Sequence, residues 1–578
     1  MALALLLLVG QFGTSLFPES PTTEADAALQ DEVELLLERR IDINRVSATE
    51  LLAIPWLNPF LAYRIVAMRD SVGGFRSIQQ VRQVPGVTDE TFEALRPFLR
   101  IAVSHQTLTG AMVSRISDDS VGSGVAGLRL LNRLEFGSDN FKIAALTEKD
   151  RGEASAFDFA SAGAELRYRR LRAVAGDFTA GSGQGLVLSA PQWRSGLAQA
   201  DELASRSVRL VSSAVEASHL RGGAVEAMLG RWNACLLGSY AARDARLNPD
   251  GSVNRLVLSG VHDDSASLAG HNSVRDATVG FATRYRGRRV AAGLVAQYSK
   301  YNRTFAPSDS ISSFAGSELM VAGAYADCRL GNYELGSEAA ASSGSGLAGA
   351  LQLSGDWQDF DSRVSIRGRQ SRFFSPHGRW PSLTNTKDQL DATGRLAWHH
   401  AGSSVSLSGN TYRDFDLDSV PARLALSLGQ ELGRLNLGLA IGVRYQAEEE
   451  RYRTARADVG FRPGRRTSLG LIVASVYPDR TQSRGAMAAL QLNQRIGAAE
   501  LGLTTARIAV DGAGVSMYLH ESGAGHIGSS YRTSVSCWRV ATGCGMRFGR
   551  WLRLGLKTGC AWKPRPVLDG AAQLELRP

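Results

Sequence analysis

Lysine is scarce in this chain of 578 residues, and cysteine is scarcer still. Nearly all of the 65 basic side chains are arginines, so arginine carries the net charge of +9. That charge is typical of proteins with anionic partners such as lipopolysaccharide or nucleic acid, although a genome-wide bias towards arginine explains it equally well. The five cysteines lack metal-ligand spacing, and their odd number excludes a complete disulfide framework. One bridge, Cys537 to Cys544, is compatible with an oxidising periplasm.

Long hydrophobic runs are also missing. No stretch of about 18 apolar residues exists, which argues against a transmembrane helix. The first residues, MALALLLLVGQFGTS, resemble the apolar region of a signal peptide, and we interpret residues 1–26 as signal peptide and linker. Only helices and closed barrels satisfy their backbone groups in lipid, so a membrane protein of this composition must be a barrel. The 61 glycines and 17 prolines suit many short strands and turns.

An alternating pattern dominates the chain after the N-terminal region. In Leu435–Gln446 every second residue is apolar, ending at Tyr445, and the others are small or polar. Because side chains alternate faces along a strand, this predicts a strand with an apolar outer face and an aromatic at the membrane interface. The same alternation recurs at Leu128–Phe136, Leu469–Tyr477, Leu552–Leu556 and Gln573–Arg577.

The second face of these strands carries Gly, Ala, Ser, Arg and Glu rather than bulky apolar residues. This favours a barrel with a wet or loosely filled interior over a soluble sandwich. We therefore predict a mainly β fold, an antiparallel transmembrane barrel of roughly 20–24 strands over residues 105–578. Three polar stretches are predicted to be its longer loops: 244–253, 308–317 and 375–387. Arg129, Arg133, Arg444 and Arg553 should face inward, where they either favour anions or pair with inward acids.

The N-terminal region follows a different pattern. Residues 27–40 have an amphipathic pattern, which predicts a helix that packs against the residues that follow it. Residues 43–101 then contain a repeat with a period of 30, in which capping boxes at 47–50 and 77–80 each open a short helix. The helices are expected to close at Ile54-Pro55 and Val84-Pro85. Residues 27–104 are therefore predicted to be a small all-α domain of two helix-turn-helix units.

The sequence of this domain, with both repeats and the linker Gly73-Gly74-Phe75, resembles the tandem helix-hairpin-helix domain of the competence DNA receptor ComEA. The resemblance implies that backbone N–H groups of each hairpin bind a DNA phosphate without reading base sequence. The first hairpin departs from the motif, since Pro55-Trp-Leu-Asn-Pro59 replaces both glycines, and the second, Pro85-Gly-Val-Thr88, keeps one. The candidate DNA contacts are Leu57, Asn58, Arg64, Arg82, Gly86, Val87, Thr88 and Arg96.

The net charge of this domain argues against strong DNA binding. Residues 41–101 contain seven arginines and six acids, a net charge of +1, so counterion release would contribute little affinity. The alternative is a degenerate module used for packing or for contact with a protein.

Motifs in the strand-rich part add a second resemblance. Gly176-Asp177-Phe178, Gly183–Leu188, Arg221–Ala224 and Arg243-Asp244-Ala245 resemble a family of uncharacterised Gram-negative outer-membrane proteins with a ComEA-like region before a large barrel. This resemblance implies an architecture and not an activity.

Motifs for catalysis or metal binding are weak. The nine histidines lie outside any nucleophile motif, and His262-Asp-Asp264 and His520-Glu521 are merely the most acidic histidine environments. Gly181-Ser-Gly-Gln-Gly185 lacks the Lys and Ser/Thr of a phosphate loop and indicates a bend or a close backbone approach. We expect no enzyme, no metal and no cofactor.

Three functions remain open. The first hypothesis is an outer-membrane conduit or docking protein for double-stranded DNA or another anionic polymer, bound through residues 43–101 in the periplasm. The second is a structural or assembly role in which the hairpins bind a periplasmic protein. The third is a general porin. In each case the barrel would sit in outer-membrane lipid.

Overall fold

A computed structural model gives the fold of the chain. The structure describes these residues: 41–44, 46, 51, 54, 57, 59–85, 87, 92, 95–101, 108–118, 127–138, 140–149, 151–152, 159–189, 208–211, 219–257, 265–287, 289–307, 314–344, 346–357, 359–378, 388–400, 402–414, 422–446, 450–464, 466–478, 483–512, 515–521, 529–549, 551–563 and 565–576.

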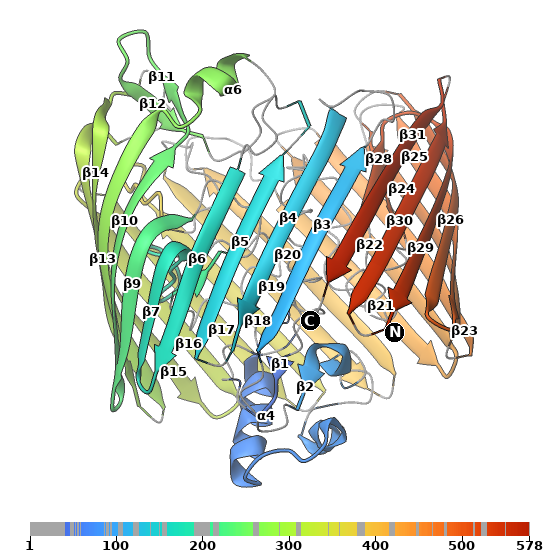
Figure 1. The fold of residues 1–578 in the computed structure, drawn as a ribbon, viewed down its shortest axis with the longest axis horizontal. Helices are drawn as coiled ribbons and strands as arrows, with labels where there is room; N and C mark the ends of the chain where they lie inside the picture. Colours follow the sequence, from blue (N-terminus) through green and yellow to red (C-terminus); the bar gives the residue numbers. More distant parts are fainter. Residues whose placement is uncertain are drawn as a thin grey trace.

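A closed antiparallel barrel makes up most of the molecule (Figure 1). Within the described ranges its wall has 24 strands. The barrel closes where β3 (Thr109–Asp118) pairs antiparallel with the last strand, β31 (Val567–Leu576), in the register Met112 to Leu576. The predicted fold class and the upper end of the predicted strand number are thus confirmed.

The first half of the wall comprises β4 (Leu128–Gly137), β5 (Phe141–Lys149), β6 (Phe159–Tyr168), β7 (Leu171–Thr179), β9 (Leu220–Leu229), β10 (Trp232–Arg243), β13 (Val274–Arg286), β14 (Val290–Phe305), β15 (Gly316–Leu330), β16 (Tyr333–Ser342), β17 (Gly346–Trp357) and β18 (Phe360–Arg369). The second half comprises β19 (Gln389–His400), β20 (Ser403–Asp414), β21 (Ala422–Leu432), β22 (Leu435–Gln446), β23 (Glu450–Gly464), β24 (Thr467–Pro478), β25 (Arg484–Ile496), β26 (Ala499–Asp511), β29 (Cys537–Phe548) and β30 (Leu552–Trp562).

Strand connections differ at the two ends of the barrel. At one end, connections of two or three residues join consecutive wall strands, whereas at the other end the connections run from three to 40 residues. The long connections hold β8 (Arg209–Leu210), β11 (Ala245–Leu247), β12 (Val253–Leu256), α6 (Ser265–Gly270), β27 (Met517–Glu521) and β28 (Ser529–Thr533). Residues 244–253, predicted as a loop, instead include β11 and the start of β12, because Ala245 pairs with Leu256 across the turn.

The outer face is apolar, as the alternation predicts. In β22, Leu439, Ile441 and Tyr445 are exposed on the outside. Exposed aromatics gather next to the short turns at Tyr168, Trp232, Tyr333, Phe360, Phe461, Phe548 and Trp551, and near the long connections at Tyr445, Tyr477, Trp538 and Trp562. An apolar band between two aromatic girdles is the surface of a membrane-spanning barrel. None of the described helices is long and apolar enough to cross a membrane.

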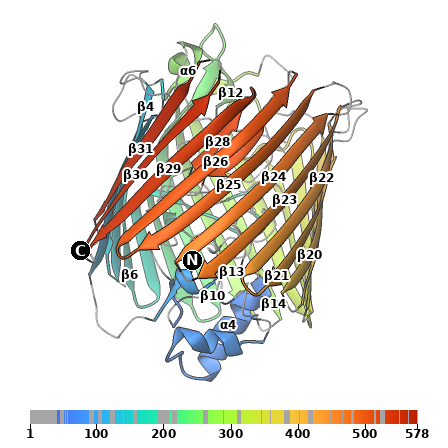
Figure 2. The ribbon, with the colours of Figure 1, turned by 90° about the vertical axis from the view of Figure 1, so that its right-hand side faces the viewer.

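The N-terminal module is small and lies at the short-turn end of the barrel, where Figures 1 and 2 show α4 beyond the mouth. Its described elements are β1 (Ile41–Asp42), α4 (Pro59–Ser71), η1 (Ile78–Gln83), η2 (Arg96–Phe98) and β2 (Leu99–Arg100). Strands β1 and β2 pair in parallel, which joins the two ends of the module. The expected helix at 27–40 and the capping box at 47–50 lie outside the described residues.

Candidate functional site

The 30-residue repeat appears directly in the backbone hydrogen bonds of the module. In the first unit the N–H of Ile54 donates to Leu51 O and that of Leu57 donates to Ile54 O, both at 3.0 Å. In the second unit Val84 donates to Val81 O at 3.2 Å and Val87 donates to Val84 O at 3.0 Å. Each pair of donors and acceptors is shifted by 30 positions, so the two units close their turns in the same way.

The second predicted capping box is present. The Oε1 atom of Gln80 accepts the N–H of Ser77 at 3.1 Å, and a short 3₁₀ helix, η1, follows and ends before Val84. The buried core repeats as well, with Leu51, Ile54 and Ile65 in one unit matching Val81, Val84 and Leu95 in the other. The two units therefore share one core rather than folding separately.

The structure brings two of the candidate arginines to the second hairpin. Arg64 of α4 donates from Nη1 to Pro85 O at 3.4 Å, and the guanidinium of Arg82 lies 4.4 Å from the ring centre of Phe92. Arg96 is exposed at the start of η2. Leu57 is buried in the core, and Val87 is half-buried with its N–H used within the turn. Asn58, Gly86 and Thr88 lie outside the described residues.

Two residues that sequence reasoning did not single out hold the module together. Asn44 forms a two-way contact with Phe75, in which Phe75 N donates to Oδ1 at 2.7 Å and Nδ2 donates to Phe75 O at 2.8 Å. Arg69 donates to the carbonyls of Ile43 and Val46. Since Arg69 joins α4 to the segment that follows β1, part of the module's positive charge serves the scaffold.

Inside the barrel, residues 181–188 leave the wall and fold inward. The carboxylate of Glu338 on β16 accepts the backbone N–H of Leu186 at 3.2 Å, and Gln184 Nε2 donates to Asp327 Oδ1 at 3.4 Å. Leu186, Val187 and Leu188 are buried in the cluster that fills this side of the lumen. The glycine-rich motif is thus a close backbone approach, one of the two structures predicted for it.

A second segment, residues 371–378, covers the first. Ser375 Oγ donates to Val187 O at 3.2 Å, and Ser189 N donates to His377 O at 2.8 Å. His377 Nε2 lies 3.0 Å from Asp276 Oδ2 and 3.3 Å from Thr278 Oγ1. Because the same imidazole nitrogen faces both groups, this contact does not form the relay that a nucleophile triad needs.

Gly183 should be essential to this inward fold. Its φ is +58°, and a Cβ there would lie 2.8 Å from Glu338 Oε2 and 2.9 Å from Tyr325 Cγ. Gly331 has a similar φ of +63° but open space around it, which makes it a matched control. Gly331→Ala should cost about 1–2 kcal/mol of unfolding free energy from the backbone alone. Gly183→Ala should cost about 1–3 kcal/mol more because the added carbon overpacks the site. Urea unfolding in lipid vesicles measures both, and equal losses would contradict the steric argument.

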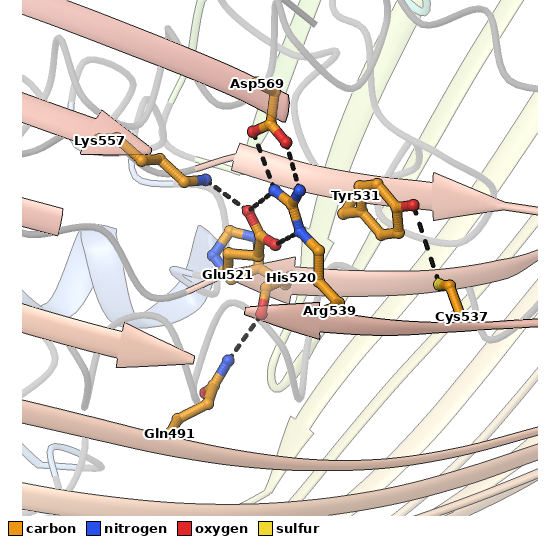
Figure 3. Close-up of polar contacts among 8 residues, drawn as sticks. All are labelled: Gln491, His520, Glu521, Tyr531, Cys537, Arg539, Lys557 and Asp569. Carbon is orange, nitrogen blue, oxygen red and sulfur yellow. Dashed lines mark hydrogen bonds and ion pairs between the residues drawn. The ribbon is translucent and has the colours of Figure 1, made fainter. Parts of the chain in front are cut away.

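On the other side of the barrel, the hairpin of β27 and β28 is tied to the wall by a buried ionic network (Figure 3). Arg539 on β29 forms paired contacts with Glu521 on β27 and with Asp569 on β31, including Nη2 to Glu521 Oε2 at 3.0 Å and Nη2 to Asp569 Oδ2 at 2.9 Å. Lys557 Nζ lies 2.7 Å from Glu521 Oε2. Two cations therefore balance two carboxylates.

The His520-Glu521 pair belongs to this network. Burial, reinforced by the nearby cations Lys557 and Arg456, lowers the pKa of His520 to about 4, so its imidazole is neutral near pH 7. Its backbone carbonyl accepts Gln491 Nε2 at 2.7 Å. The described residues contain no group of three or more metal-ligating side chains. His262-Asp-Asp264 lies outside the described residues.

The structure also tests the predicted disulfide and the predicted inward arginines. The Cys537–Cys544 bridge is wrong, because the residues lie seven positions apart on β29 and so point to opposite faces, Cys537 buried and Cys544 exposed. Of the inward arginines, Arg553 lies 3.8 Å from Glu575, so at least this one pairs with an inward acid.

The helix-hairpin-helix motif model matches residues 38–100. An uncharacterised protein of Neisseria meningitidis serogroup A and the transcriptional accessory protein Tex of Neisseria gonorrhoeae are each 34% identical over 105 residues, 18% of this chain and 14% of theirs. The chain therefore spans only a small part of these relatives.

Solved barrels resemble the larger part of the chain in outline. The translocation pore of the P pilus usher PapC has a TM-score of 0.38 at 12% identity, covering 81% of this chain and 99% of that one. A variant of the ferric enterobactin receptor PfeA of Pseudomonas aeruginosa has a TM-score of 0.41 at 8% identity, covering 82% and 81%. The chain thus joins a helix-hairpin-helix segment to a 24-strand β-barrel.

Proposed function

We propose that this protein docks DNA, or another polymer with a phosphate backbone, at the periplasmic mouth of an outer-membrane barrel. The observation that carries the proposal is the second hairpin of the module, next to which α4 supplies Arg64 and η1 supplies Arg82. A helix-hairpin-helix unit with arginines beside its turn offers guanidinium groups to a phosphate.

The orientation of the barrel supports a periplasmic mouth. In outer-membrane barrels the short turns face the periplasm and the long loops face outward. Here the module precedes β3, which starts at the short-turn end, and β31 ends there too. DNA bound by the module would consequently lie at the opening of the barrel.

The proposal predicts weak, salt-sensitive binding that is independent of base sequence. Changing both Arg82 and Arg96 to Glu should make the slope of log K against log salt shallower, by about one for each phosphate that the protein no longer binds. The measurement is fluorescence anisotropy of a short labelled DNA duplex with the full chain in detergent micelles, across a salt series.

The matched control changes Arg275 and Arg484 to Glu. Both are exposed at strand starts on the long-connection end, so the variant has the same net charge with the module intact. Equal weakening of DNA binding in both variants would show a non-specific charge effect. Absence of binding by the unmodified chain even at low salt would overturn the proposal and favour a module that contacts a periplasmic protein. A general porin would conduct ions whether or not the hairpin arginines are changed.

A further inference from the structure

Three neighbouring short turns of the barrel wall carry exposed arginines. The turns join β6 to β7, β9 to β10 and β13 to β14, and they are neighbours because β7 pairs with β9 and β10 with β13. The N–H of Met228 donates to Arg170 O at 2.9 Å, which ties the first turn to the second. The N–H of Arg286 donates to Arg231 O at 2.8 Å, which ties the second to the third. We call the exposed set the turn arginines: Arg169, Arg170, Arg231, Arg286 and Arg289.

No carboxylate balances this charge. In the described part of the chain, none of the turn arginines forms an ion pair. The acids of the adjoining strands are buried on the inner face, where Glu165 and Glu226 contact Arg172. Asp327, on the strand next to β14, contacts Arg284. Because neighbouring like charges repel, the turn arginines gain stability when an anion lies among them.

Other short turns of the wall have acids beside their basic residues. Arg329 lies 3.5 Å from Glu334 across the turn between β15 and β16. Asp359, in the next turn, lies 3.0 Å from Nδ1 of His400. The unbalanced positive charge is thus concentrated on one part of the rim.

Two of the turn arginines contact the aromatic girdle. The guanidinium of Arg169 lies 5.3 Å from the ring centre of Tyr168, and Nη1 of Arg231 donates to the hydroxyl of Tyr285 at 3.3 Å. The ring of Tyr285 packs against Trp232 with 5.2 Å between centres. Tyr168 and Trp232 are both more than half exposed on the outer face. Since such a girdle marks the membrane interface, these guanidinium groups lie at the level of lipid head groups.

A groove on the outer face of the same strands lies beside this cluster. It has a volume of about 370 Å³ and crosses β6, β7, β9 and β10. Its floor is a row of four directly opposed small residues: Ala164, Ala175, Gly223 and Gly238. Leu166 and Leu236, one row closer to the short turns, are each 62% exposed and line its edge. Leu166 is three residues from Arg169, about 10 Å along the strand.

We propose that the turn arginines and this groove bind an anionic phospholipid of the periplasmic leaflet, with its phosphate at the arginines and an acyl chain in the groove. Guanidinium groups bind phosphate through two parallel hydrogen bonds, and basic pockets at the membrane surface hold lipid head groups. The short turns of outer-membrane barrels face the periplasm, where this leaflet lies. The inference goes beyond DNA docking and uses no residue of the N-terminal module.

The test is native mass spectrometry of the full chain in detergent micelles, with cardiolipin or phosphatidylcholine added at equal concentration. The unmodified protein should retain cardiolipin in preference to phosphatidylcholine. Removing one arginine from each turn, with Arg170→Gln, Arg231→Gln and Arg289→Gln, should weaken cardiolipin binding about tenfold or more. Because salt screens exposed charges, the difference from the unmodified protein should shrink at high ionic strength.

The matched control removes three arginines from three other neighbouring short turns, with Arg434→Gln, Arg466→Gln and Arg495→Gln. Glu500 pairs with Arg495 there, and Glu431 adjoins the turn of Arg434. Cardiolipin binding should change little in this variant. Equal weakening in the two triple variants would show a non-specific charge effect and overturn the inference.

Gly238→Leu tests the groove separately. A Cβ on Gly238 has no atom within 4 Å, so the leucine fills the groove without displacing the wall. Cardiolipin binding should weaken several-fold, by a factor that stays the same as salt is raised. Migration on semi-native gels shows that each variant is a folded barrel. Unchanged cardiolipin binding in either the Arg170, Arg231, Arg289 variant or Gly238→Leu would overturn the inference. Loss of DNA binding with lipid binding unchanged would overturn it too, by assigning the turn arginines to DNA.

Discussion

Replacing Glu521 by Gln is expected to release the hairpin of β27 and β28 from the barrel wall. The substitution removes the carboxylate that contacts both Arg539 and Lys557 while keeping the size of the side chain. Arg539 is 1% exposed and Glu521 is fully buried, so water cannot replace the missing charge. Breaking a buried ion pair by removing one partner typically costs about 3–5 kcal/mol.

Amide hydrogen exchange over residues 517–521 and 529–533 measures this effect, because local opening exposes those backbone groups to solvent. Glu500→Gln is the matched control. It removes the partner of Arg495 at a short turn, where the arginine is about half exposed, and a surface pair is worth at most about 1 kcal/mol. Unchanged exchange in the Glu521 variant would mean that apolar contacts of the hairpin, and not the network, hold it in the lumen.

The strands of the barrel wall could be predicted because the alternation that identifies them involves only neighbouring residues in the sequence. Alternation with period two in Leu435–Gln446 fixes which side chains face lipid, and β22 has these same bounds. The repeat of the N-terminal module was equally predictable, since the hydrogen bonds at Ile54 and Val84 follow directly from the 30-residue offset.

The contents of the lumen could not be predicted, because they depend on contacts between distant parts of the chain. Glu338 and Leu186 are 152 positions apart, and nothing near either residue indicates their contact. The role of Arg539 depends on the long connection between β26 and β29, which supplies Glu521. Which residues lie opposite each other on neighbouring strands, such as Arg367 and Asp391, depends on strand register, which alternation alone leaves undetermined.

Replacing Leu428 by Arg is expected to destabilise the barrel strongly, whereas the same change at its neighbour Ser427 is not. Leu428 is exposed on the outer face near the middle of β21. An arginine on the lipid face costs about 2–4 kcal/mol at the bilayer midplane. Ser427 points inward and lies opposite Ser406 and Ala440, whose small side chains leave room for an arginine.

Urea unfolding in lipid vesicles, followed by tryptophan fluorescence, compares the two variants in the same bilayer. Both add one positive charge at adjacent positions of one strand, so the charge and its location along the chain are matched. The difference in unfolding free energy then reports which face meets lipid. Equal destabilisation would mean that both faces of β21 are dry, whereas the alternation predicts that only the face carrying Leu428 meets lipid.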